Sequence, residues 1–229
     1  MKNNNSNLKK IKKLCAVSML CALAFVVSFC FPIKVQFLTF DAKDAIIAIG
    51  GMFFGPLAAL CMSLTVPFLE FLSVSDTGLY GLIMNFLSSA AFSVTASLVY
   101  KYRRKMNGAV LGLSLSVVVT TAVMLLANLI ITPIYARYVG FPLDIIKELP
   151  RLILPFNLTK TVLNASLVLL LYKPFTQALK ATKLVPMGSS KKLSAKTTAI
   201  TICAAVLLLI ASIAVYVLVL GGSFSFFGK

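Results

Sequence analysis

Long apolar runs, separated by short polar segments, constrain this chain more than any other feature of its sequence. The runs cover 14–31, 45–72, 80–100, 109–134, 152–172 and 199–220. A hydrocarbon core about 30 Å thick is crossed by about 20 helical residues, so runs of this length are typical of transmembrane helices. The chain is 59% hydrophobic and 12% charged, which leaves too little polar surface for a separate soluble domain. We therefore expect an all-α protein of the cell membrane.

The basic residues lie mainly in the segments between the apolar runs. The formal net charge is +16, with 22 Lys and Arg. In a soluble protein this charge would indicate a nucleic-acid partner, but beside apolar runs Lys and Arg face anionic membrane lipids and orient the helices. We therefore expect contact with membrane lipids, no nucleic-acid partner, and a cytoplasmic N-terminus.

The apolar stretch 45–72 can form one long helix or two helices that separate near Gly55 and Pro56. One helix would place the basic cluster at 101–105 outside the cell, whereas two helices place it inside. Because Lys and Arg favour the cytoplasmic side, the sequence favours two helices. The first of them, 43–54, would be only about 18 Å long, so it must be a partial span shielded by its neighbours.

The predicted organisation is a six-helix membrane core followed by an extra helix. A basic cytoplasmic N-terminus covers 1–13, the substrate-binding core 14–175, a basic cytoplasmic linker 176–197, and the extra transmembrane helix with a short tail 198–229. The core helices are expected near 14–31, 43–54, 56–72, 79–100, 108–133 and 151–172, and the seventh near 199–220. The C-terminus lies outside the cell if the seventh helix spans the membrane.

All six acidic residues fall in outer loops or at outer helix ends in this topology. They are Asp41, Asp44, Glu70, Asp76, Asp144 and Glu148. Acidic residues contribute little to helix orientation, so topology alone does not explain their placement. Solvation of loops is one interpretation, and a binding site at the outer face is the other.

Lys160 lies inside the last core helix, where an ionisable group costs about 2.5–3.5 kcal/mol on insertion scales. Asn157 lies one helical turn before it and Asn164 one turn after it, so helical spacing puts all three on one face. A polar stripe of this kind usually faces a cavity or a polar partner. It is a candidate small-molecule site.

Polar residues on three other core helices are expected at a comparable depth. They are Glu70, Asn85 and Asn128. Their donors and acceptors could converge with the stripe on one ligand, or they could form hydrogen bonds between helices without any ligand.

The segment after the first helix, 32–43, combines aromatic and polar residues, among them Leu38, Thr39 and Phe40. This mixture suits a cover over a flat aromatic ligand, and it equally suits an aromatic belt at the membrane interface. The first helix also carries a face of small residues, Cys15, Ser18 and Ala22, which permits close helix approach. A partner membrane protein or another helix of this chain could pack there.

The chain lacks the residues that several kinds of chemistry require. It has no histidine, no phosphate-binding G-x-x-x-x-G-K-[S/T] loop, and no nucleophile beside a base. The five cysteines lie in apolar runs without metal-site or disulfide spacing. We therefore expect no enzyme activity, no catalytic residues and no metal site, and any uphill transport would need an ion gradient or an ATPase partner.

Four short motifs resemble the riboflavin-specific S components of energy-coupling-factor (ECF) vitamin transporters. They are F-L-T-F-D-A-K-D at 37–44, G-P at 55–56, T-G-x-x-G at 77–81 and P-F-N-L-T-K at 155–160. The resemblance covers about 14–175, and P-F-N-x-x-K is its most specific part. It implies a six-helix subunit that captures riboflavin as cargo, not as a cofactor, and joins a membrane coupling protein with two cytoplasmic ATPases.

The resemblance also assigns roles to residues. It implies that Asn157, Lys160 and Asn128 bind the flavin and that 38–40 closes over it. The coupling protein would dock on the first helix, where this chain has Ser18 and Ala22 in place of the usual pair of alanines. Two alternatives stay open: an S component for another vitamin such as thiamin, and a membrane interaction or signalling protein that uses 176–229.

Overall fold

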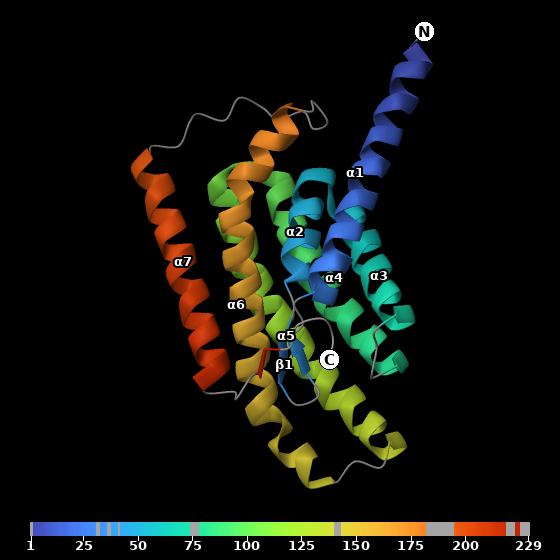
Figure 1. Cartoon of the computed structure of the whole chain (residues 1–229), viewed down its shortest axis with the longest axis vertical. Helices are drawn as coiled ribbons and strands as arrows, with labels where there is room; N and C mark the ends of the chain where they lie inside the picture. Colours follow the sequence, from blue (N-terminus) through green and yellow to red (C-terminus); the bar gives the residue numbers. More distant parts are fainter. Residues whose placement is uncertain are drawn as a thin grey trace.

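The computed structural model describes residues 2–30, 33–35, 38–40, 42–73, 78–139, 143–181, 195–218 and 223–224. Within them, seven helices and three short strands follow one another (Figure 1). The helices are α1 (Lys2–Cys30), α2 (Lys43–Phe54), α3 (Pro56–Ser73), α4 (Gly78–Tyr102), α5 (Met106–Val139), α6 (Leu143–Ala181) and α7 (Ala195–Leu218). The strands are β1 (Ile33–Val35), β2 (Leu38–Phe40) and β3 (Ser223–Phe224). The predicted helical membrane fold, a six-helix core with a seventh helix after it, is confirmed.

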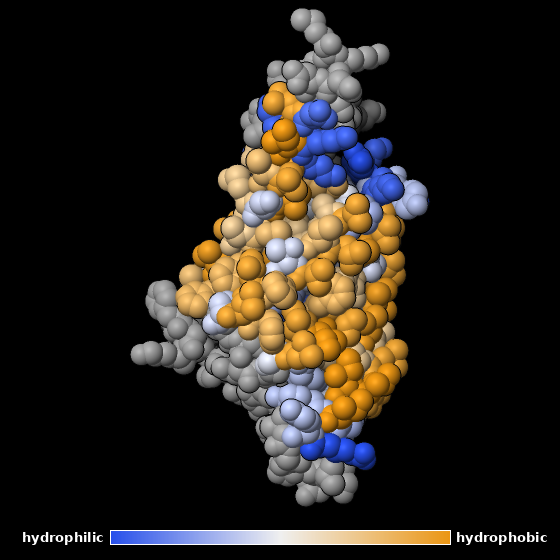
Figure 2. All heavy atoms as spheres, turned by 90° about the vertical axis from the view of Figure 1, so that its right-hand side faces the viewer, coloured by the Kyte–Doolittle hydropathy of each residue, from blue (hydrophilic) through white to orange (hydrophobic). Residues whose placement is uncertain are grey.

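Among the described residues, five helical segments are long and apolar enough to cross a membrane. They are Lys10–Cys30, Pro56–Ser73, Gly78–Tyr102, Met106–Tyr135 and Ile153–Ala178. On the side that carries α1 and α3, the surface has an apolar middle with hydrophilic residues towards both ends (Figure 2). We call the end with the N-terminus and the α4–α5 turn the basic end, and the end with the three strands the sheet end (Figure 1).

Helix α2 is the short helix that the sequence predicts, and all of its residues are buried. It ends where Gly55 adopts a φ of 102°, a conformation that favours glycine. Gly51 lets the neighbouring helices approach, because a Cβ there would lie 2.6 Å from the Cβ of Ala59 on α3. The predicted break between 54 and 56 is therefore correct, and it folds α2 back against α3.

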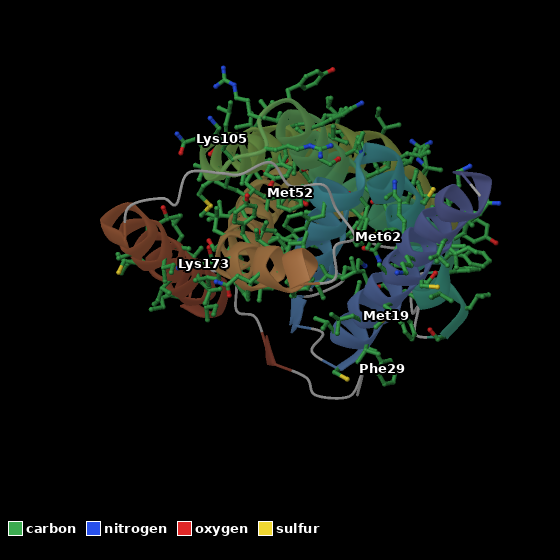
Figure 3. The ribbon with its side chains drawn as sticks, turned by 90° about the horizontal axis from the view of Figure 1, so that it is seen from above. Met19, Phe29, Met52, Met62, Lys105 and Lys173 are labelled. Atoms are coloured by element: carbon green, nitrogen blue, oxygen red, sulfur yellow. The ribbon has the colours of Figure 1, made fainter. Side chains whose placement is uncertain are left out.

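The core surrounds α2, which explains why a helix too short to span a membrane is stable there. Met52 of α2 and Met62 of α3 lie inside the bundle when it is viewed from the basic end (Figure 3). In the same view, α1 and α7 lie on opposite sides of the molecule. The backbone hydrogen bonds of α2 are thus shielded by protein, as a partial span requires.

Several helices are longer than the apolar runs that predict them. α1 begins at Lys2, α5 continues to Val139, and α6 extends from Leu143 to Ala181. Hydropathy marks only the part of a helix that lies in hydrocarbon, whereas Lys, Gln and Leu continue a helix readily into water. The predicted limits 151–172 for the last core helix are therefore too short at both ends.

The segment between α1 and α2, predicted as a loop, contains two strands. β1 and β2 pair antiparallel, with Val35 opposite Leu38 and Ile33 opposite Phe40. β3, from the C-terminal part of the chain, pairs antiparallel with the other edge of β1, so the strand order is β2-β1-β3. This sheet lies in the half of the molecule away from the N-terminus, beyond the ends of α1 and α2, and α5 and α6 extend past it (Figure 1).

Candidate ligand-binding site

The first turn of α2 begins inside the bundle and carries two buried charges. Lys43 is 1% exposed and Asp44 is 3% exposed. A charge removed from water is tolerated when a partner neutralises it and hydrogen bonds saturate it. Lys43 and Asp44 therefore need partners on the helices that surround them.

Lys43 pairs with Glu70 of α3. The Glu70 carboxylate also accepts hydrogen bonds from Ser28 of α1 and from the side-chain amide of Asn85 of α4, the latter at 3.3 Å. We call these four residues the Lys43–Glu70 network. It joins α1, α2, α3 and α4 through one carboxylate.

Two further contacts fix the same turn of α2 to other helices. Ser89 of α4 donates a hydrogen bond to the Asp44 carboxylate. The backbone N–H of Ala45 donates to the Oδ1 of Asn164 on α6, at 3.0 Å. No side chain at the N-cap position of α2 caps this helix. Asn164, from a distant part of the chain, therefore supplies the shorter of two hydrogen bonds to the Ala45 N–H, the other being to the carbonyl of Ala42 at 3.3 Å.

The polar stripe on α6 faces the interior of the bundle. Asn157, Lys160 and Asn164 are all buried, whereas Leu154 and Leu158 on the same turns are exposed. The Asn157 amide donates to the carbonyl of Ile153 at 2.9 Å, and that of Asn164 donates to the carbonyl of Lys160 at 3.1 Å. Helix α6 therefore presents the ammonium and amide groups of the stripe to the inside of the bundle and apolar side chains to its outer surface.

Helices α4 and α5 contribute a second polar group. The Thr132 hydroxyl donates to the Oδ1 of Asn128 at 3.0 Å, and it also lies 2.8 Å from the Tyr80 hydroxyl. The rings of Tyr80 and Tyr135 stack with centroids 4.2 Å apart. Asn128 is thus held in a network that ends in two stacked aromatic rings.

The structure brings several of the predicted site residues together. Asn85 donates a hydrogen bond to Glu70, and Asn164 accepts one from the backbone of α2. Asn157 and Lys160 are buried on one face of α6. The backbone of Leu38, Thr39 and Phe40 forms β2, but their side chains lie outside the described residues. Asp41 and Asp76, and the side chains of Asp144 and Glu148, also lie outside them.

Sequence reasoning missed Lys43 and misread Asp44. It assigned no pairing or binding role to Lys43, the first residue of the predicted helix 43–54, and it offered loop solvation as an interpretation for the acidic residues. In the structure both are buried in the first turn of α2, so loop solvation is wrong for Asp44. The available signal was their position at the start of a helix too short to span, because such a helix must be surrounded by protein.

The small-residue face of α1 is open. Cys15, Ser18 and Ala22 are exposed, whereas Cys21 and Ala24, on the other side of the helix, are buried. Packing of the small residues within this chain was one interpretation of the sequence, and it is wrong for the described residues. This face is left to lipid or to another molecule.

Buried ammonium, carboxylate and amide groups thus lie within a helical bundle whose outer surface is apolar. A few convergent polar groups in apolar surroundings are typical of small-molecule binding sites. Within the described part of the chain, no cluster of three or more His, Cys, Asp or Glu residues could hold a metal ion. The fold and these groups define a multi-pass membrane protein with an internal polar site.

Comparison with known proteins agrees with this class. Residues 12–172 match the family described as "ECF transporter, substrate-specific component". The riboflavin transporter RibU of Staphylococcus aureus (strain TCH60) is 32% identical over 183 residues, which cover 76% of this chain and 95% of RibU. The riboflavin transporter FmnP of Bacillus subtilis (strain 168) is 28% identical over 181 residues, with 73% and 95% covered.

A solved structure agrees as well. It is titled "Structure and mechanism of the S component of a bacterial ECF transporter" and is similar to this chain with a TM-score of 0.62 and 32% identity. The alignment covers 75% of this chain and 99% of that one. The chain therefore belongs to the family of ECF transporter substrate-specific (S) components. It is a substrate-binding transporter component and not an enzyme.

Proposed function

We propose that this S component binds riboflavin and passes it to an ATP-driven ECF importer. The observation that carries the proposal is the buried stripe of Asn157, Lys160 and Asn164 on α6, in a chain similar to two riboflavin transporters. Riboflavin has a planar ring with carbonyl and imide edges and a chain of hydroxyls. Amide and ammonium donors in an apolar bundle match this chemistry.

The binding residues in this proposal come from the helices around the first turn of α2. Asn157, Lys160 and Asn128 bind the flavin directly, while Leu38, Thr39 and Phe40 cover it. Glu70, Asn85 and Asn164 act differently: they hold the N-terminus of α2, which follows the covering segment. Glu70 pairs with Lys43, Asn85 donates to Glu70, and Asn164 accepts from the backbone N–H of Ala45; these contacts support this role.

The orientation follows from the distribution of charge. The basic end carries Lys10, Lys12 and Lys13 on α1 and the cluster 101–105 after α4, so we assign it to the cytoplasm. Riboflavin then enters from the outside, at the sheet end. A membrane coupling protein docks on the open face of α1 around Ser18 and Ala22, and two cytoplasmic ATPases complete the transporter.

Titration of the purified protein with riboflavin, followed by quenching of flavin fluorescence, tests the binding site. We expect Asn157→Ala/Lys160→Ala to weaken riboflavin binding by 100-fold or more, on the order of 3 kcal/mol for two lost hydrogen bonds, one of them to a charged group. Leu158→Ala is the matched control, because Leu158 lies between the two but faces outward. It should bind like the wild type.

Thiamin, titrated in parallel, separates riboflavin from another vitamin as the cargo. If the protein binds thiamin and not riboflavin, the cargo is thiamin and the assignment as an S component stands. Equal riboflavin affinity in the double variant and the wild type would remove Asn157 and Lys160 from the site.

A further inference from the structure

The C-terminal part of this chain reaches back to the segment that covers the proposed site. Helix α7 runs along α6 from the basic end to the sheet end (Figure 1). Four residues separate Leu218 from β3, which pairs with β1 and places Phe224 opposite Ile33 and Ser223 opposite Lys34. We call α7 and β3 together the C-terminal strap.

The strap lies outside the part of the chain that the S-component family defines. The family match ends at residue 172, whereas α7 begins at Ala195. Helix α7 has 24 residues and is therefore about 36 Å long, and the apolar stretch among its described residues is Thr201–Val215. Ala205 and Ser212 are buried on its inner side, while Leu207 and Ile210 remain exposed. The strap is thus packed on the bundle as an addition to the family fold.

The strap connects two sides of the proposed site. The β1–β2 hairpin is joined in sequence to α1 and α2, whereas the strap is fixed along α6, the helix that carries Asn157 and Lys160. A two-stranded hairpin of three-residue strands is only marginally stable on its own. With β3 in place, β1 is the central strand and is paired on both edges. Moving the hairpin away from the bundle then means either breaking the β1–β3 pairing or carrying β3 along, which its four-residue connection to α7 restricts.

We propose that the C-terminal strap positions the β1–β2 hairpin over the ligand and slows ligand exchange. This inference rests on the proposed function, because it takes the hairpin as the cover of a riboflavin site. The β3 strand acts through the backbone of β1 and does not contact the flavin. It is a positioning segment, and its effect lies on the rate of release.

The experiment measures riboflavin release from the full-length protein after mixing with excess unlabelled competitor flavin. Ser223→Pro/Phe224→Pro removes both backbone N–H groups of β3, whichever of them faces β1, and deletion of 219–229 removes the strand. We expect both to speed release on the order of 10-fold, the effect of one or two lost backbone hydrogen bonds. Ser223→Ala/Phe224→Ala keeps both backbone N–H groups and is the matched control, with release close to the wild-type rate.

A cross-link provides a second test that does not depend on weakening the strand. Ile33→Cys/Phe224→Cys, in a background with the five native cysteines replaced by serine or alanine, places two thiols on directly paired positions. Oxidation should trap bound riboflavin, and reduction should restore release. Formation of the cross-link without any change in release, or failure of the two thiols to cross-link, would overturn the proposal.

The outcomes separate the strap from the function on which it rests. If the wild type does not bind riboflavin, both the proposed function and the role of the strap are contradicted. Tight binding with the same release rate in the wild type, Ser223→Pro/Phe224→Pro and the deletion variant would contradict the strap's role and leave the proposed function standing.

Discussion

The buried ion pair between Lys43 and Glu70 shows, at the residue scale, how the bundle tolerates two charges removed from water. Each charge neutralises the other, and Ser28 and Asn85 donate to the same carboxylate. Removing one member of such a pair is costly because it leaves an uncompensated charge, whereas removing both is often close to neutral. This asymmetry distinguishes an electrostatic role of the pair from simple packing.

Lys43→Met leaves the Glu70 carboxylate without its counter-ion, and we expect it to destabilise the protein by about 3 kcal/mol. Lys43→Met/Glu70→Gln should regain part of this loss, since a neutral amide can still accept the hydrogen bond from Ser28. Thermal unfolding in detergent measures both, with Leu57→Ala, exposed on the same helix as Glu70, as the control. A double variant that unfolds at or below the temperature of Lys43→Met would contradict the electrostatic interpretation.

Of the residues in the candidate site, some could be predicted from the sequence and others could not. The common face of Asn157, Lys160 and Asn164 follows from the helical repeat alone, which is a local property. The burial of Lys43 depends on Glu70 in another helix, and the capping of Ala45 by Asn164 joins residues far apart in the chain. No local pattern encodes such contacts.

At the scale of helices and strands, α2 packs closely against α3 and α4. A Cβ added to Gly51 would lie 2.6 Å from the Cβ of Ala59 and 3.2 Å from that of Ser97. The break that separates α2 from α3 was predictable from Gly55, Pro56 and the distribution of charge. Strands of two or three residues were not, because they are too short to show alternation and β3 pairs across most of the chain.

Gly51→Ala forces α2 away from α3, and we expect it to cost about 1–3 kcal/mol through overpacking. Thermal unfolding in detergent measures the loss. Adding Ala59→Gly removes the closer of the two contacts and should restore part of the stability. If Gly51→Ala unfolds at the wild-type temperature, the close approach of α2 and α3 is not a constraint on this fold.

The molecule as a whole has two distinct lateral faces. α7 covers one side of α6, while α1 lies on the opposite side and leaves its small residues exposed (Figure 3). Hydropathy and charge were sufficient to predict a multi-pass membrane protein with a short second helix. The path of the chain after α6 could not be predicted, because the return of β3 to β1 is a contact between the two ends of the sequence.

Ala22→Phe places a bulky ring on the proposed docking face without touching the site. We expect it to leave riboflavin binding by the purified protein unchanged and to lower riboflavin uptake by cells at least 10-fold. Leu126→Phe, on the exposed face of α5, should alter neither property. Normal uptake by the Ala22→Phe variant would place the coupling protein on a different surface.

The absorption spectrum of the protein, purified in detergent from cells grown with riboflavin, tests the central claim most directly. We predict a flavin band in near one-to-one ratio with protein, which is lost in Asn157→Ala/Lys160→Ala and kept in Leu158→Ala. A folded protein that carries no flavin and takes up none when riboflavin is added would contradict the account.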